Sequence, residues 1–178
     1  MLVLLAVATV LAAGTTLVWA NPIEGTTTFA TRDTAILANE TLADWLADTA
    51  LPLFFPNHTG WDTYYDQFFS PDLTATFGIN SYNYTTLKEY FFGTQEALAS
   101  QFEFYAVEID SRVALASPDG VGGQVLLTGK QYGVLRSSGE EVVGTDGVYS
   151  VIKEVNGQRL ITEWRDFTNT GTDGTAAS

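Results

Sequence analysis

The segment that decides the fold is residues 102–167, which read FEFYAVEIDSRVALASPDGVGGQVLLTGKQYGVLRSSGEEVVGTDGVYSVIKEVNGQRLITEWRDF. Three turn signals divide it: Ser-Pro-Asp-Gly at 117–120, Ser-Ser-Gly at 137–139 and Asn-Gly at 156–157. The runs between these signals are rich in β-branched and aromatic residues, a pattern typical of antiparallel hairpins. The segment therefore predicts four long strands, at residues 102–116, 124–136, 142–155 and 159–167.

Glycines inside these strand runs predict that the sheet is strongly curved. A glycine in a strand interior often marks a bulge or a sharp bend, because it adopts backbone angles that other residues resist. The glycines concerned are Gly129, Gly133, Gly144 and Gly147.

Three helices are expected before the long strands. Apolar residues at three- and four-residue spacing predict helices at 41–55, 61–69 and 85–100, with a short strand at 73–79. Pro52 and Pro56 bound or kink the first helix, because proline lacks the backbone N–H that a helix interior needs. Helices followed by an antiparallel meander predict an α+β fold in which the helices cover one face of a bent sheet.

The chain begins with an uncharged apolar run, residues 1–20, that ends in Val-Trp-Ala before Asn21. Its length and the small residues before Asn21 predict a secretory signal peptide, and a membrane anchor is the alternative. Residues 21–39 are expected to form an extended lead-in, residues 40–168 the folded domain, and residues 169–178 a disordered tail.

Asn-X-Ser/Thr triplets agree with a secreted, extracellular glycoprotein. The acceptor residues of the three triplets are Asn39, Asn57 and Asn83. The chain has no cysteine, so disulfides and thiolate metal sites are excluded and stability must come from the core. With one histidine, His58, which we place in an exposed loop, the sequence predicts no metal site and no cofactor.

The net charge of -13 and the pI near 4.1 disfavour nucleic acid as a partner, because phosphate backbones would be repelled. The acidic residues are scattered rather than gathered into a tail, so we interpret them as a solvated surface. After signal cleavage no contact with a membrane is expected.

Residues 61–73 (WDTYYDQFFSPDL), the helix around 87–91 (LKEYF) and residues 156–166 (NGQRLITEWRD), taken with the order of the elements, resemble the NTF2-like superfamily and in particular its SnoaL-like branch. The resemblance covers residues 42 to 167. It implies a cone in which three N-terminal helices pack on a strongly curved antiparallel sheet. Some members enclose an apolar pocket, and others are binding or dimerisation modules, so a homodimer through the outer sheet face is also implied. A lipocalin-like barrel is the alternative, and the three helices before the sheet argue against it.

Aromatic residues make up 13% of the chain, which predicts an interior or a pocket rich in rings. A small apolar or aromatic molecule is the expected ligand. The residues expected to contact it are Tyr65, Phe69, Phe91, Tyr132 and Trp164.

Asp146 is the candidate catalytic residue, because a carboxylate on a concave apolar face can carry a proton. It lies mid-strand on one face with Gly144 and Val148, although residues 145–147 also fit a turn or a bulge. In the last strand, alternation places Leu160, Thr162, Trp164 and Asp166 together on one face, and the sequence leaves open whether that face is concave.

The sequence leaves two alternative functions open. The first is a non-catalytic binder of a small apolar or aromatic molecule, favoured by the many rings and by the lack of the paired histidines of scytalone dehydratase-like proteins. The second is a cofactor-free lyase or isomerase, dehydratase- or cyclase-like, that uses one buried carboxylate.

Overall fold

The structure is a computed structural model that describes residues 41–167. The predicted signal peptide at 1–20, the lead-in at 21–39 with Asn39, and the tail at 169–178 lie outside the described residues.

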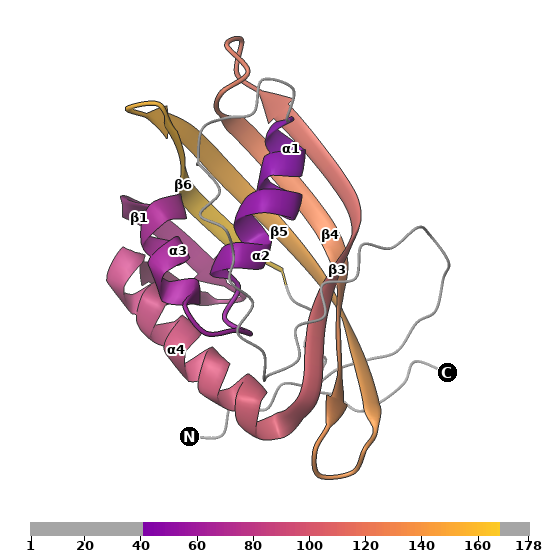
Figure 1. The fold of residues 1–178 in the computed structure, drawn as a ribbon. Helices are drawn as coiled ribbons and strands as arrows, with labels where there is room; N and C mark the ends of the chain where they lie inside the picture. Colours follow the sequence, from indigo (N-terminus) through magenta and orange to yellow (C-terminus); the bar gives the residue numbers. More distant parts are fainter. Residues whose placement is uncertain (1–40, 168–178) are drawn as a thin grey trace.

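A single curved sheet carries the fold, and Figure 1 shows the helices in front of it. The strand order is β2-β1-β6-β5-β4-β3. β1 and β6 run parallel, and the other neighbours run antiparallel. The strands are β1 (Phe69–Phe77), β2 (Asn80–Asn83), β3 (Phe102–Ala116), β4 (Gly123–Leu135), β5 (Glu141–Val155) and β6 (Gln158–Asp166). The predicted α+β class and the four long strands are confirmed, and β2 is an element that the sequence did not predict.

The first predicted helix is a continuous run of three pieces: α1 (Leu42–Asp44), the π-helical η1 (Trp45–Ala50) and α2 (Leu51–Phe54). Pro52 explains the change of winding. Its ring would clash with the carbonyl four residues earlier in a regular α-helix. The π turn just before it shifts the bonding, so that the Leu51 N–H donates to the Leu46 carbonyl.

Two more helices complete the layer, α3 (Trp61–Phe68) and α4 (Tyr84–Gln101). Asn83 caps α4, because its side chain accepts from the Thr86 N–H at 3.0 Å while the Thr86 hydroxyl accepts from the Asn83 N–H at 3.0 Å. This reciprocal pair fixes where the helix starts.

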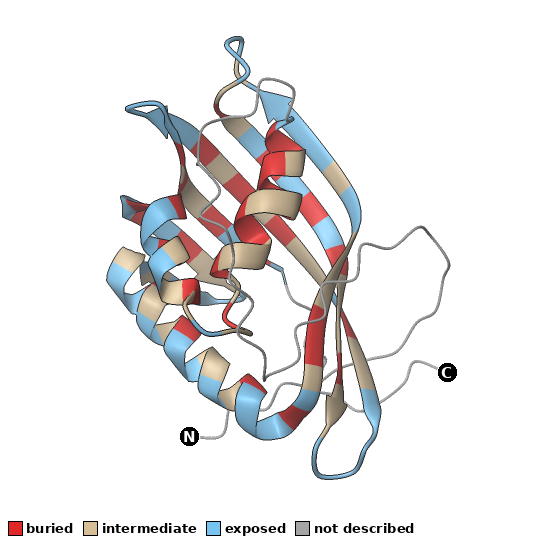
Figure 2. Ribbon diagram, viewed as in Figure 1, coloured by how far each residue is buried: buried red, intermediate tan, exposed pale blue. Residues whose placement is uncertain are grey.

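The core lies between the helices and the concave face of the sheet. In Figure 2 the buried residues lie on the sides of the helices that face the sheet and recur along the central strands. Trp61 and Tyr65 of α3 and Phe54 of α2 are almost fully buried. Burying each such side chain contributes roughly 1.5–3 kcal/mol or more to folding.

Two bulges of β3 lie opposite the part of β4 that contains Gly129 and Gly133. The register of β3 against β4 shifts between Phe102 and Phe104, next to Gly133, and between Ile109 and Ser111, next to Gly129. A Cβ on Gly129 would lie 2.1 Å from the Glu108 carbonyl oxygen, so only glycine fits there. Gly144 and Gly147 pair with β4 in regular register, so neither marks a bulge there.

An irregularity in β6 overturns the expected alternation of that strand. The register of β5 against β6 shifts between Val151 and Ile152, which leaves Thr162 as an extra residue. Arg159 and Ile161 are therefore buried before the shift, and Trp164 and Asp166 after it. The expectation that Leu160 and Thr162 share a face with Trp164 is wrong, because a bulge exchanges the two faces of a strand.

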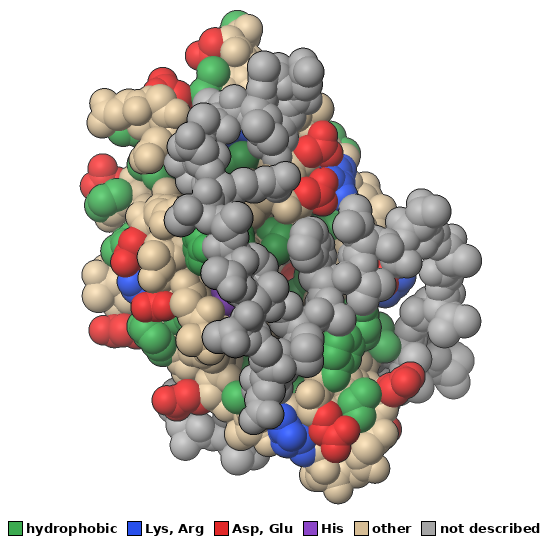
Figure 3. Space-filling view, viewed as in Figure 1, with side chains coloured by type: hydrophobic (Ala, Val, Ile, Leu, Met, Phe, Trp, Pro, Cys, Tyr) green, Lys and Arg blue, Asp and Glu red, His purple; other side chains and the backbone are tan. Residues whose placement is uncertain are grey.

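The surface is acidic without a single acidic patch on the side seen in Figure 3, where Asp and Glu side chains are scattered. One cluster links the layers: Arg112 of β3 contacts Asp44 at 3.0 Å and Asp48 at 2.5 Å. Within residues 41–167, no helix combines the length and the apolar character needed to span a membrane.

Candidate functional site: a ring-lined cavity with a carboxylate pair

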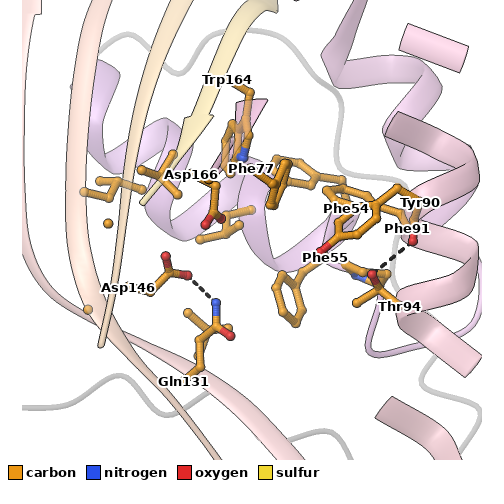
Figure 4. Close-up of a pocket in the computed structure, with 18 of the residues that line it drawn as sticks. Phe54, Phe55, Phe77, Tyr90, Phe91, Thr94, Gln131, Asp146, Trp164 and Asp166 are labelled. Carbon is orange, nitrogen blue, oxygen red and sulfur yellow. Dashed lines mark hydrogen bonds between the residues drawn. The ribbon is translucent and has the colours of Figure 1, made fainter. Parts of the chain in front are cut away.

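A cavity of about 810 Å³ lies between the concave face of the sheet and the helices α2 and α4. Aromatic rings form much of its wall, as Figure 4 shows. The labelled rings are those of Phe54, Phe55, Phe77, Tyr90, Phe91 and Trp164. A volume of this size is in the range that small-molecule sites occupy.

The rings are held by contacts between different elements. Phe54 of α2 packs edge-on against Trp164 of β6 at 5.5 Å between ring centroids. Phe55 stacks on Tyr105 of β3 at 6.2 Å, and Phe77 of β1 meets Tyr90 of α4 at 5.1 Å. Helix, turn and sheet therefore fix the wall together, and each contact adds about 0.5–1.5 kcal/mol beyond area burial.

Polar groups gather on the sheet side of the cavity. The Tyr105 hydroxyl donates to the side-chain carbonyl of Gln131, and the Gln131 amide donates to the carboxylate of Asp146. Figure 4 shows Gln131 and Asp146 facing each other from neighbouring strands. An amide that accepts on one side and donates on the other has its orientation fixed. These two hydrogen bonds, which we call the Tyr105–Gln131 relay, therefore hold the Asp146 carboxylate in one position.

Asp166 brings a second carboxylate to the same wall. It pairs with Val148 across β5 and β6, so it is the diagonal neighbour of Asp146 on the same face. Its side chain is buried, with 7% of the residue exposed, whereas Asp146 is half-buried. Two acidic side chains on adjacent strands thus share one apolar cavity.

Tyr90 and Tyr105 of the wall stay protonated. Burial, followed by the charges of Asp146 and Asp166, raises the pKa of Tyr105 far above its usual value. Burial also raises the pKa of Tyr90. At physiological pH both side chains are therefore neutral hydroxyls that can donate hydrogen bonds to a bound molecule.

Trp164 leaves a polar atom unsatisfied at this end of the cavity. The residue is 3% exposed, and its indole N–H has no hydrogen-bond partner among the described residues. Figure 4 shows the indole nitrogen on the side of the ring toward Asp166 and Phe77. Buried donors normally have an acceptor, so this N–H is a position where an acceptor would be stabilised.

The structure brings three of the predicted site residues to the cavity: Asp146, Phe91 and Trp164 all line it. Asp146 lies within β5 in regular register, so the alternative of a turn at residues 145–147 is wrong. Because Asp146 shares its face with the buried Val148, strand alternation alone was enough to predict where it points.

The other three predicted contact residues lie away from the cavity wall. Tyr65 and Phe69 are 0% and 1% exposed and stack on each other in the core at 4.4 Å, where helix α3 passes into β1. Tyr132 lies on the opposite face of β4 from Gln131 and packs near Phe104, with 5.7 Å between centroids. An aromatic residue in a core or on an outer face has the same sequence signature as one in a pocket.

Tyr105, Gln131 and Asp166 also line the cavity, and none of them was predicted as a site residue from the sequence. Strand alternation places Gln131 and Gly129 on one face, and this is the signal that could have found Gln131. The face of Asp166 could not be found in that way, because the bulge at Thr162 changes the parity of the strand.

The remaining predicted positions lie outside the cavity. Asn57 is half-buried and Asn83 is exposed. His58 is also half-buried rather than exposed, with its ring nitrogens 3.0 Å from the Thr59 carbonyl and 3.2 Å from the Pro52 carbonyl. Among residues 41–167, no three His, Cys, Asp or Glu side chains are grouped so that they could hold a metal ion.

Comparisons with known proteins give a fold and no sequence relative. No protein-family model matches the chain, and no curated protein matches it in sequence.

Solved structures do match, all at low sequence identity. A SnoaL-like polyketide cyclase from Jannaschia sp. CCS1 has a TM-score of 0.51 at 16% identity, over 75% of this chain and 90% of that one. An NTF2-like superfamily protein from Salmonella enterica has a TM-score of 0.52 at 17% identity, over 70% and 89%. The hexachlorocyclohexane dehydrochlorinase LinA-type3 from Novosphingobium barchaimii has a TM-score of 0.54 at 9% identity, over 68% and 81%.

These matches share the architecture described above, in which a few helices pack on the concave face of one curved sheet. Identities this low report the fold and leave the chemistry to the site itself. The chain has an NTF2-like fold.

Proposed function

We propose that this chain binds a small apolar or aromatic molecule in its cavity. The observation that carries the proposal is the cavity itself, about 810 Å³ of space with ring walls and a few convergent polar groups. A cavity of this size leaves its wall without the contacts that packed side chains would have made. Such a space is the usual form of a ligand site.

Titration with a neutral fluorescent probe, N-phenyl-1-naphthylamine, tests this proposal. We expect saturable binding with a Kd of about 0.1 mM or tighter, accompanied by a blue shift as the probe leaves water. Thr94 lies on α4 and lines the cavity, so Thr94→Trp should fill the space and weaken binding by about tenfold or more.

Ser100→Trp is the matched control, because Ser100 is exposed on the same helix and gains the same ring outside the cavity. Equal binding by both variants, or no saturable binding to the unmodified chain, would contradict a cavity site. Circular dichroism establishes that each variant is folded.

A lyase or isomerase that uses Asp146 as a base is the second candidate function. Two observations favour it: the carboxylate lies on an apolar wall, and the Tyr105–Gln131 relay holds it in position. The dehydrochlorinase of similar fold shows that this architecture can carry an enzyme. A carboxylate with little water around it is a stronger base than one in solution.

A generic proton-abstraction substrate, 5-nitrobenzisoxazole, tests the second candidate without knowledge of the natural one. The base takes the proton from carbon 3, the nitrogen–oxygen bond breaks, and a nitrile and a coloured phenolate form. We expect a rate about 10²-fold or more above that of acetate at the same pH. Asp146→Asn should remove this excess, and Asp110→Asn on the outer face should keep it. A rate equal to that of acetate, or no loss in Asp146→Asn, would leave binding as the function.

We also propose that the chain is secreted and glycosylated. The apolar run at residues 1–20 and the triplets at Asn57 and Asn83 support this proposal.

A further inference from the structure

The ionisable groups of the cavity wall are all acidic, and none of those on the described residues is a base. Among the described residues they are two aspartates, Asp146 and Asp166, and three tyrosines, Tyr82, Tyr90 and Tyr105. A carboxylate attracts a cation, and a tyrosine ring presents the negative face of its quadrupole to one. The wall therefore combines two features that recognise positive charge.

The carboxylates and the rings lie where one ligand could reach both. Figure 4 shows Asp146 and Asp166 on the sheet side of the cavity, with the rings of Phe54, Phe55 and Phe77 beside them. Only 7% of Asp166 is exposed, so water screens its charge poorly. The field of the two carboxylates reaches the surrounding rings, since it contributes to the raised pKa of both Tyr90 and Tyr105.

Trp164 independently indicates a polar ligand group at this end. Its N–H is buried, lines the cavity and has no partner among the described residues. A purely hydrocarbon ligand would leave this donor unsatisfied at a cost of about 1–3 kcal/mol. An ammonium group has no acceptor, so this donor calls for a hydroxyl or ether oxygen elsewhere on the same ligand, and the preference for positive charge rests on the carboxylates and the rings.

We propose that the cavity takes an organic cation: a protonated amine carried on an apolar ring body, with the amine directed at Asp146 and Asp166. This inference rests on the proposed binding function and specifies its ligand class. The ring body packs among the aromatic residues, and the ammonium group is stabilised by the carboxylates and by the faces of nearby rings.

Three probes built on one ring separate charge from shape. They are 1-naphthylmethylamine, 1-naphthalenemethanol and 1-naphthoic acid, which at pH 7 are a cation, a neutral molecule and an anion. Each is measured by displacement of N-phenyl-1-naphthylamine from the unmodified full-length chain. We expect the amine to bind at least about tenfold more tightly than the alcohol and the acid to bind most weakly.

Substitutions then assign the effect to the wall. Asp166→Asn and Asp146→Asn should each reduce the preference for the amine over the alcohol by about threefold or more, while binding of the alcohol changes less. Asp110→Asn is the matched control, because it removes one negative charge from an exposed position of β3 that pairs with Lys130 at 3.2 Å. It should leave all three affinities unchanged.

The outcomes distinguish this inference from the proposal beneath it. Equal binding of amine and alcohol, or tightest binding of the acid, overturns the cation inference and leaves a neutral cavity site. Failure of all three probes and of N-phenyl-1-naphthylamine overturns the binding function itself. The comparison of probes on the unmodified chain needs no variant, so it remains decisive where a substituted chain does not fold.

Discussion

The hydroxyl of Tyr84 illustrates how a single side chain links two elements. It donates to Asp66 of α3 at 2.5 Å, and the same carboxylate pairs with Lys88 of α4 at 2.6 Å. Burial, and then the bond to Asp66 and its charge, raises the pKa of Tyr84 to about 12. In contrast, the pKa of the Asp66 carboxyl is lowered: burial opposes the shift, and the bonds from Lys88 and Tyr84 outweigh it.

The sign of the Tyr84 shift predicts an effect at alkaline pH. Because the folded pKa lies above the unfolded value of about 10, the stability that this group contributes is complete below pH 10 and is lost as the pH rises through about 12. Asp66→Asn should lower the pKa of Tyr84 toward its ordinary value. Tyrosinate absorbance near 295 nm, followed against pH, measures the shift.

Two controls make that titration specific to Tyr84. Asp72→Asn removes an exposed carboxylate elsewhere and should leave the titration unchanged. In a Tyr84→Phe background, Asp66→Asn should have no further effect. A shift that persists without Tyr84 would mean that another tyrosine reports it.

Residues of the site differ in how far the sequence could predict them. Asp146 follows from alternation within one strand, because β5 stays in register with β4 throughout their pairing. Asp166 does not, because the register shift opposite Thr162 depends on how two strands meet. Tyr65 and Phe69 were expected at the ligand, but composition cannot separate a pocket ring from a core ring.

At the scale of elements, local signals were sufficient wherever turns punctuate the chain. Residues 102–116 were predicted as a strand, and β3 has the same bounds. β2 was missed because its four polar residues, Asn80–Asn83, form a strand only by pairing with β1. The π turn of η1 was likewise outside the reach of periodicity, although Pro52 predicted a disturbance there.

Two glycines predict opposite responses to the same substitution. Gly129→Ala should lower the free energy of unfolding by about 2 kcal/mol or more, because the new Cβ would lie 2.1 Å from the Glu108 carbonyl oxygen. Gly93→Ala should raise it by about 0.5–1 kcal/mol, because Gly93 is exposed within α4 and a Cβ there meets nothing within 4 Å. Urea unfolding of both variants measures the difference, and equal effects would contradict the close approach of β3 and β4 at Gly129.

At the scale of the whole molecule, the proposed secretion can be tested by processing. Expression of the full chain in a secreting eukaryotic host should yield protein in the medium that begins at Asn21. Its mass, measured after enzymatic removal of N-glycans, should equal that of the chain without residues 1–20. Thr85→Ala destroys the triplet at Asn83 and should remove one glycan without touching the helix cap that Asn83 provides. Retention of residues 1–20, or protein that stays with the membrane fraction, would favour the anchor.

The outer face of the sheet carries a group of exposed apolar side chains that could pair with a second copy of the chain. Val113, Leu115 and Leu126 are 61%, 71% and 44% exposed. Val113 pairs directly with Leu126, whose neighbours Val125 and Leu127 point into the core, so this apolar group lies on the convex side. Exposed apolar side chains gathered on one sheet face are a common feature of homodimer interfaces.

We therefore expect the chain to be a dimer through this convex face. Light scattering during size-exclusion chromatography should give twice the monomer mass, and Leu126→Lys should weaken the dimer by about tenfold or more, because it places two like charges in a symmetric interface. Ile79→Lys is the matched control, since Ile79 is 99% exposed in the turn between β1 and β2. A dimer that survives Leu126→Lys but not Ile79→Lys would place the interface at the β1–β2 edge, whereas a monomer at all concentrations would leave the convex face to solvent. The cavity lies on the concave face, so a dimer formed on the convex side keeps both cavities separate and predicts ligand binding without cooperativity.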